Sequence, residues 1–227
     1  MKPNVVGGAL IMALTMAAPA SAQYDAGAAM DMTGMGIYAM EDAMTDAAKE
    51  EDGSKGKTAP QAPSFDFQPD PKVRAQIIQS MAKEIPSAAT LLNTPNIIEH
   101  IDRSVMQPNG LRSNNVADAF AMWASLAWVQ VNQSTVKPTP TMLKAVKNQF
   151  TEKLTEGGNL TTGLDANKQQ LSDFLILRTF LMIAFFGAAE GKPEQKAELI
   201  KEVDAGAKAF GMNLTKMTLT EQGFVPR

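Results

Sequence analysis

The feature that most constrains this sequence is an apolar run of sixteen residues, 174–189, with the sequence FLILRTFLMIAFFGAA. Only Arg178 and Thr179 carry strongly polar side chains within it. Apolar residues cover both sides of a helical wheel, which is typical of a helix at the centre of a core or in a membrane. The run spans roughly 24 Å as a helix, less than the roughly 30 Å of a hydrocarbon core, and a charge at its middle is costly there. We therefore predict a buried central helix on which the rest of the chain packs.

Residues 1–22 have the composition of a secretory signal peptide. Lys2 supplies a positive charge, residues 5–16 form an apolar segment, and Ala20-Ser21-Ala22 is a small-residue cleavage site. The alternative is an uncleaved N-terminal anchor, which the short apolar segment and the cleavage site both disfavour. We expect a bacterial protein that is periplasmic or secreted, with no stable membrane insertion after cleavage.

Residues 23–67 differ in composition from the rest of the chain, and we call them the N-terminal arm. Gly, Ala, Met and acidic residues dominate residues 23–52, and residues 53–63 (GSKGKTAPQAP) form a polar linker. Eight acidic and three basic side chains give residues 23–63 a charge of about −5. Low hydrophobicity combined with net charge predicts disorder. The following domain, residues 68–227, is nearly neutral, so its charge indicates no affinity for nucleic acid.

Five methionines lie close together in this arm: Met30, Met32, Met35, Met40 and Met44. Thioethers are ligands suited to Cu(I), which makes Met30, Met32 and Met35 candidate metal ligands, although no His accompanies them. The alternative, which we favour, is a weakly amphipathic segment, residues 37–44 (IYAMEDAM), that docks on another surface. The chain has no Cys, which excludes disulfides, thiol nucleophiles and thiolate metal sites. We expect no cofactor.

Proline at the first helical position predicts four helices, because the N–H that proline lacks has no partner there. The pairs are Asp70-Pro71, Thr94-Pro95, Thr139-Pro140 and Lys192-Pro193. The predicted spans are 71–84, 95–105, 140–155 and 193–210. Apolar patterning predicts two further helices over 114–133 and 165–190. The fold class is therefore all-α, a six-helix bundle-like domain with two central apolar helices.

The tail, residues 213–227, alternates weakly between apolar and polar residues. It could form a short strand, but no pairing strand is evident in the sequence. We expect an extended strap that packs Leu214, Leu219 and Phe224 onto the bundle.

One constellation of polar residues falls inside the apolar helices: Asn114, Asn115, Asp118 and Arg178. A buried guanidinium needs a carboxylate, and Asp118, one turn into the second apolar helix, is the best-placed acid. We predict an internal ion pair that fixes the helix register, and a small-molecule pocket is the alternative. The only histidine, His100, is expected to be exposed on a helix. No nucleophile elbow, phosphate loop or zinc motif is present, so we predict a non-enzymatic protein.

The segment NNVADAFAMW, residues 114–123, is followed by Ala127-Trp128 and by an ending with Leu219-Thr220 and Gly223-Phe224. This pattern resembles an uncharacterised family of exported bacterial helical proteins, a domain of unknown function. The resemblance covers residues 68–227 and leaves out the Met-rich arm. It implies a helical architecture and an exported location, and it transfers no catalytic residues.

The leading hypothesis is an exported, non-enzymatic helical domain that mediates protein interaction in the cell envelope, with the arm as its docking segment. One alternative is a periplasmic copper-binding protein that uses the Met-rich arm. The other is a small-molecule binder at the Asp118 and Arg178 island.

Overall fold

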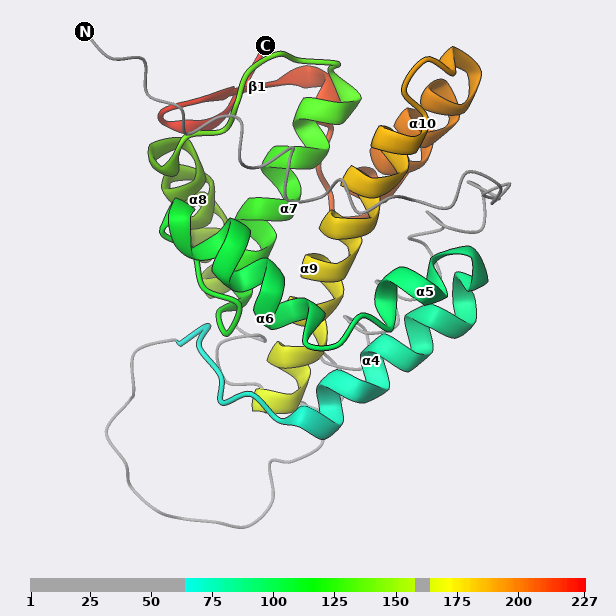
Figure 1. The fold of residues 1–227 in the computed structure, drawn as a ribbon. Coiled ribbons are helices and arrows are strands. Elements are labelled where there is room, and N and C mark those ends of the chain that lie inside the picture. The colour runs from blue at the N-terminus through cyan, green and yellow to red at the C-terminus, as the bar shows by residue number, and fades with distance from the viewer. Residues whose placement is uncertain (1–63, 158–163) are drawn as a thin grey trace, which may run out of the picture.

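The structure is a computed structural model that describes residues 64–157 and 164–227. In these residues the chain is mostly helical, with seven α-helices and two short strands. The predicted signal peptide and residues 23–63 of the predicted arm lie outside the described residues. Figure 1 shows helices α7 and α9 running through the middle of the molecule, with the other elements arranged around them.

The first helices follow the proline signals in part. Helix α4 (Pro71–Glu84) begins where predicted, and the side chain of Asp70 caps it by accepting a hydrogen bond of 2.8 Å from the Lys72 N–H. A short helix α5 (Ala89–Leu92), which the sequence did not predict, follows a 3-10 turn. Helix α4 packs on the side of α9.

The predicted helix 95–105 is shorter and less regular than expected. Helix α6 (Ile97–Ile101) starts two residues late, because Asn96 adopts a left-handed conformation with φ of 53°. A π-helical turn (Asp102–Met106) and a 3-10 turn (Gln107–Asn109) then end the segment. The pair Thr94-Pro95 therefore forms a turn before the helix.

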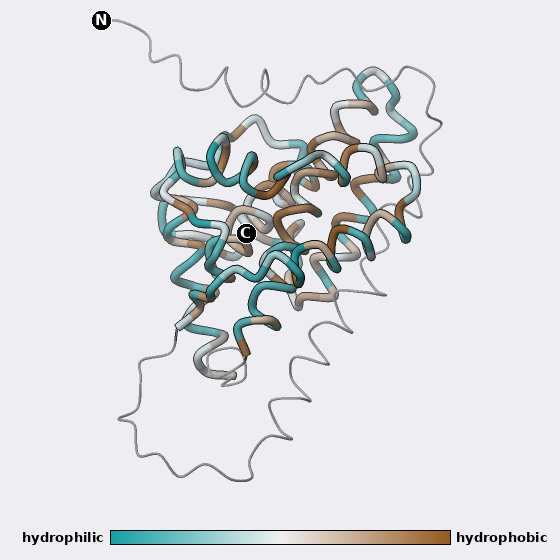
Figure 2. Tube along the Cα trace, turned by 60° about the horizontal axis from the view of Figure 1, so that its bottom comes forward, coloured by the Kyte–Doolittle hydropathy of each residue, from teal (hydrophilic) through white to brown (hydrophobic). Residues whose placement is uncertain are grey.

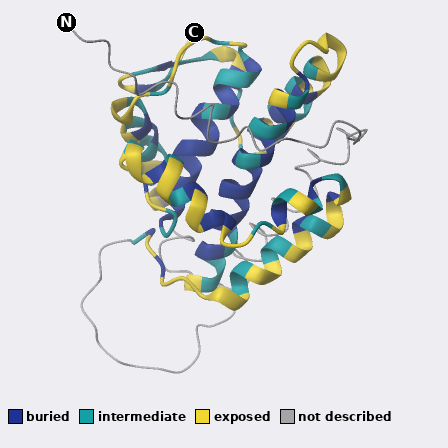
Figure 3. Ribbon diagram, viewed as in Figure 1, coloured by how far each residue is buried: buried dark blue, intermediate teal, exposed yellow. Residues whose placement is uncertain are grey.

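Helices α7 (Val116–Val131) and α9 (Asp165–Ala188) form the centre of the core. Most residues of both helices are buried, as the dark blue parts of their ribbons in Figure 3 show. Helix α9 is the one helix among the described residues that is long and apolar enough to cross a membrane, but 72% of its most apolar window is buried inside the protein. The predicted central helix is confirmed.

Helices α8 (Pro140–Gly157) and α10 (Pro193–Ala209) cover α7 from different sides. The ring of Phe120 on α7 stacks on Phe150 of α8 with a centroid separation of 3.5 Å. Phe210, at the end of α10, packs against Trp123 on α7 with ring centroids 5.0 Å apart. Hydrophobic residues accordingly gather on the inside of the trace in Figure 2.

The C-terminal tail is a β-hairpin, which corrects the predicted unpaired strap. Strands β1 (Met217–Thr220) and β2 (Gly223–Pro226) pair antiparallel, with Leu219 opposite Phe224. The missing pairing strand was the end of the tail itself, because a two-residue loop is enough to reverse the chain. Leu214 and Leu219 are buried and Phe224 is partly buried, as expected.

Side chains of α7 and α8 hold this hairpin on the bundle. The indole N–H of Trp128 donates a hydrogen bond of 2.8 Å to the Met217 carbonyl. The Gln149 side chain accepts from the Phe224 N–H at 2.8 Å and donates to the Phe224 carbonyl at 3.0 Å. The Gln149 amide therefore pairs with β2 as a neighbouring strand would.

The domain begins earlier than residue 68. Phe65 and Phe67 are 6% and 3% exposed, and Asp66 forms an isolated β-bridge with Asn115. Residues 64–67, assigned to the arm by composition, thus belong to the folded domain, and we call them the arm root. The alternation of Phe65, Asp66 and Phe67 is the period-two pattern of a half-buried extended segment.

Candidate functional site

Two carboxylates, Asp118 on α7 and Asp173 on α9, are completely buried. A buried charge is costly unless it is paired and hydrogen-bonded, so the partners of these acids define the polar interior of the domain. Asp118 is met by two cations and Asp173 by one, all from neighbouring elements.

Asp118 is held from two sides. The ammonium of Lys147 on α8 lies 2.7 Å from Asp118 Oδ1, and the Arg112 Nε lies 3.5 Å from Oδ2. The side chain of Asn115, which caps α7, accepts a hydrogen bond of 3.0 Å from the Asp118 N–H. Burial raises the pKa of Asp118, and its interactions with Lys147 and then Arg112 oppose that rise.

The same cluster extends to the arm root. Asp66 Oδ1 accepts a hydrogen bond of 2.8 Å from Arg112 and one of 2.5 Å from the Asn115 amide. Charges therefore alternate along Asp66, Arg112, Asp118 and Lys147. This row joins the arm root, the loop before α7, α7 itself and α8, and we call it the Asp118 cluster.

A second cluster surrounds Asp173. Arg74 on α4 donates from Nε to Oδ2 at 3.2 Å and from a terminal nitrogen to Oδ1 at 3.3 Å, a bidentate pair. Arg74 also pairs with the half-exposed Glu99 on α6. Gln169 donates to Asp173 Oδ2 at 3.1 Å. Burial raises the pKa of Asp173, and Arg74 opposes the rise.

Gln169 connects this cluster to the start of α4. Its side chain accepts from the Asp70 N–H at 2.7 Å and donates to the Asp70 carbonyl at 2.9 Å. A neighbouring contact, from the Gln68 N–H to Asp165 Oδ2 at 2.9 Å, brings the chain just after the arm root to the first residue of α9. The Asp173 cluster and these contacts therefore fix α4, and the residues directly before it, on α9.

The structure brings together three of the four residues predicted to form the polar island. Asn114 contacts the arm root through its carbonyl, which accepts from the Phe67 N–H at 3.2 Å, and Asn115 and Asp118 lie in the Asp118 cluster. Arg178 is buried, with its guanidinium carbon 5.2 Å from the centroid of the Phe174 ring.

The predicted ion pair between Asp118 and Arg178 is wrong. In the described part of the chain the ion pairs of Asp118 are with Lys147 and Arg112. The reason is geometric: the carboxylate on α7 is directed at α8 and at the loop before α7, where these cations lie. A helical wheel of α7 gives the buried position but not which neighbouring helix faces it.

Sequence reasoning missed the cations that hold both acids, and it missed Asp173. Lys147 interrupts an apolar stripe of α8, and Arg74 interrupts one of α4, which are signals for a cation directed inward. Asp173 directly precedes the apolar run that begins at Phe174.

The other residues considered for a functional role are His100 and the candidate metal ligands. His100 is exposed on α6 as expected. The candidate copper ligands Met30, Met32 and Met35 lie outside the described residues. Among residues 64–157 and 164–227, no group of three or more His, Cys, Asp or Glu side chains is placed to hold a metal ion.

These contacts define a class of protein: a mostly helical domain in which buried acids fasten neighbouring elements together. The chain belongs to a family of unknown function, DUF6683, whose model matches residues 1–227. No curated protein and no solved structure matches it. The resemblance to an uncharacterised family is confirmed, whereas bacterial origin and export stay predictions.

Proposed function

We propose that this chain is an exported, non-enzymatic helical domain that makes protein contacts in the cell envelope through residues 23–63. The proposal is supported by the signal-peptide pattern of residues 1–22 and by the distinct acidic, Met-rich composition of the segment that follows it.

The observation that carries the proposal is the anchoring of the arm root. The Phe65 carbonyl accepts a hydrogen bond of 3.1 Å from the Val116 N–H, and both phenylalanines are buried in the core. Asp66 between them is bound by Arg112 and Asn115. Residues 23–63 therefore join the domain at a fixed point, which is the geometry needed to present a segment to a partner.

The burial and ion pairing of Asp118 and Asp173 also favour a protein-contact function over an enzymatic one. Asp118 and Asp173 have no exposed surface, and the cations around them are engaged in holding elements together. A general acid or base must reach its substrate within hydrogen-bond distance, which an enclosed and ion-paired carboxylate does not do. We therefore assign both clusters a structural role.

The test is affinity capture from bacterial envelope extract with two baits: residues 23–227, and residues 64–227, which keep the arm root. We expect discrete proteins retained by the longer bait and lost with the shorter one. A third bait, Ile37→Asp/Met44→Asp in residues 23–227, checks whether retention depends on apolar contacts. Equal retention by the first two baits would place the contact on the helical body and contradict the proposal.

A copper-binding function remains the second candidate, favoured by the Met30-Asp31-Met32 spacing. A titration of Cu(I) against residues 23–227 and residues 64–227 distinguishes it. Binding by the longer chain alone, abolished by Met30→Leu/Met32→Leu, would support copper handling. A small-molecule site at the polar island would instead show as thermal stabilisation of both chains by the same ligand.

A further inference from the structure

Helix α9 is buried along most of its circumference, but its C-terminal half carries an apolar stripe that is open on one side. The residues recur at spacings of three and four, so they share one face. Gly187 is exposed and the others are half-buried. The residues of this α9 stripe are Phe180, Ile183, Ala184, Gly187 and Ala188.

The space beside the stripe is open to another segment. A Cβ placed on Gly187 would meet no atom of the described residues within 4 Å beyond its own helix. Small residues at three of the five positions allow a second helix to approach closely. The stripe thus has the shape and polarity of a docking surface for an apolar helical face.

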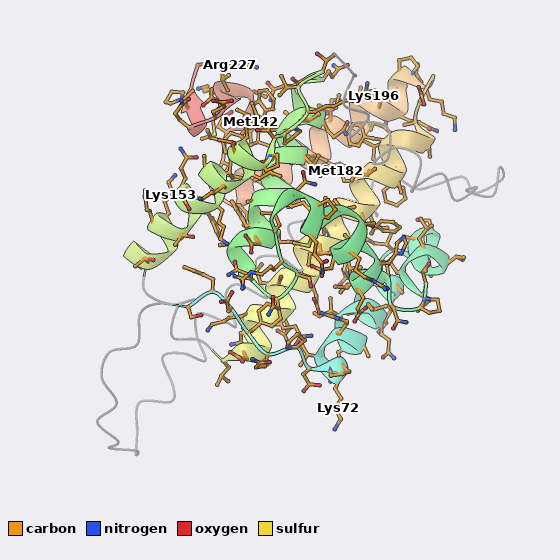
Figure 4. All side chains as sticks on the ribbon, turned by 60° about the vertical axis from the view of Figure 1, so that its left-hand side comes forward. Lys72, Met142, Lys153, Met182, Lys196 and Arg227 are labelled. Atoms are coloured by element: carbon orange, nitrogen blue, oxygen red, sulfur yellow. The ribbon has the colours of Figure 1, made fainter. Side chains whose placement is uncertain are left out.

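The arm root lies at the opposite end of the same helix. The Gln68 N–H bonds to Asp165, the first residue of α9, and the stripe begins roughly 22 Å further along the helix and ends at roughly 35 Å. Figure 4 shows the two ends of the molecule, with Lys72, near the start of α4, at one end and Lys196, near the start of α10, at the other.

Residues 45–63 can span that separation. A linker of nineteen residues reaches up to roughly 60 Å when extended and has a root-mean-square length of roughly 24 Å. The segment before it, residues 37–44, therefore lies within reach of the stripe without strain.

This segment has the complementary pattern. As a helix it places Ile37, Met40 and Met44 on one face, with Glu41 at the edge of that face and Asp42 on the opposite side. Methionine adapts its shape to irregular apolar surfaces and suits a stripe built of large and small residues. We propose that residues 37–44 dock as a helix on the α9 stripe of their own chain. The docking goes beyond the proposed function: it shields the arm until a partner protein competes for it.

Disulfide trapping tests the docking, because the chain has no Cys of its own and only introduced thiols can react. Met40→Cys is combined with Ala184→Cys on the stripe, and a matched control combines Met40→Cys with Ala205→Cys, an exposed alanine on α10. In residues 23–227 under mild oxidation, we expect the stripe pair to close at least about tenfold faster than the control pair. Adding Ile37→Asp and Met44→Asp should lower its rate to that of the control.

Equal rates for the two pairs would overturn the proposal. Disulfide-linked dimers from the stripe pair would overturn it in a different way, by making a second copy of the chain the occupant. No partner protein is present in this experiment, so its failure leaves the capture experiment intact. Conversely, a trapped intrachain disulfide supports the docking even if no envelope protein is captured.

Discussion

Removing either partner of the ion pair between Lys147 and Asp118 should be costly, because the remaining charge then loses its closest counter-charge. At 2.7 Å and an effective dielectric constant of about 20, the attraction is about 6 kcal/mol before the cost of desolvation. Breaking a buried pair by removing one partner typically costs about 3 to 5 kcal/mol. Arg112 remains 3.5 Å from the carboxylate, and Lys147 is itself 27% exposed. We therefore expect Lys147→Met to cost about 3 kcal/mol, the lower end of this range.

A double-mutant cycle measures the pair itself. The variants are Lys147→Met, Asp118→Leu and their combination, and unfolding in urea is followed by the fluorescence of Trp123 and Trp128 on α7. The combined variant should recover part of the loss, with a coupling energy of at least about 1.5 kcal/mol. Lys144→Met, an exposed lysine one turn earlier on α8, is the control and should change stability by less than about 0.5 kcal/mol. Losses that add within about 0.5 kcal/mol would refute the pairing.

The cost of Lys147→Met should also depend on pH. Burial raises the pKa of Asp118, so the folded chain holds this proton to higher pH than the unfolded chain does. The stability that this carboxyl contributes is therefore present at low pH and is lost as pH rises through its folded pKa. Lys147 opposes that loss because it stabilises the ionised form of Asp118. Removing Lys147 should therefore lower the free energy of unfolding most at pH 7, and progressively less as Asp118 becomes protonated. A loss that is the same from pH 7 down to about pH 4 would contradict this.

Two further predictions concern the ends of the domain. Deleting residues 23–63 should lower the melting temperature of the chain only slightly, because within them only the eight-residue segment 37–44 is proposed to pack on the domain. Deleting residues 23–67 should lower it further, by more than about 5 °C, through the loss of two buried phenylalanines. Equal melting temperatures for the two deletions would contradict the anchored root. Gly223→Ala should destabilise more than Gly211→Ala, because both positions have positive φ but only the Cβ at Gly223 would approach Gln149 Oε1, to 2.3 Å. Chemical unfolding of the two variants checks this. Equal losses of unfolding free energy would show that the Gln149 side chain moves aside without an energetic cost.

The sequence predicted the helices well where a local signal marks their ends. Helices α4, α8 and α10 begin at the predicted prolines, since the fixed φ and missing N–H of proline act within one residue. The two central helices followed from composition alone, because a helix that is apolar on all sides has to be buried.

The errors concern relations between segments. Which cation meets Asp118 depends on how α7, α8 and the preceding loop pack, and nothing within α7 encodes that. The hairpin was missed because its strands have four residues each and weak alternation. Phe65 and Phe67 were assigned to the arm because a composition window averages them with their polar neighbours.

The central claim, an exported domain that contacts proteins through its arm, is tested most directly by cross-linking in living cells. A photoreactive residue replaces Tyr24, which lies before the proposed docking segment, and a control probe replaces the exposed Lys201 on α10. The account predicts a discrete adduct with another protein in the envelope fraction from the Tyr24 probe and none from the Lys201 probe. The contradicting result is a chain that keeps its first 22 residues and stays in the cytoplasm, or adducts that form from α10 and not from the arm.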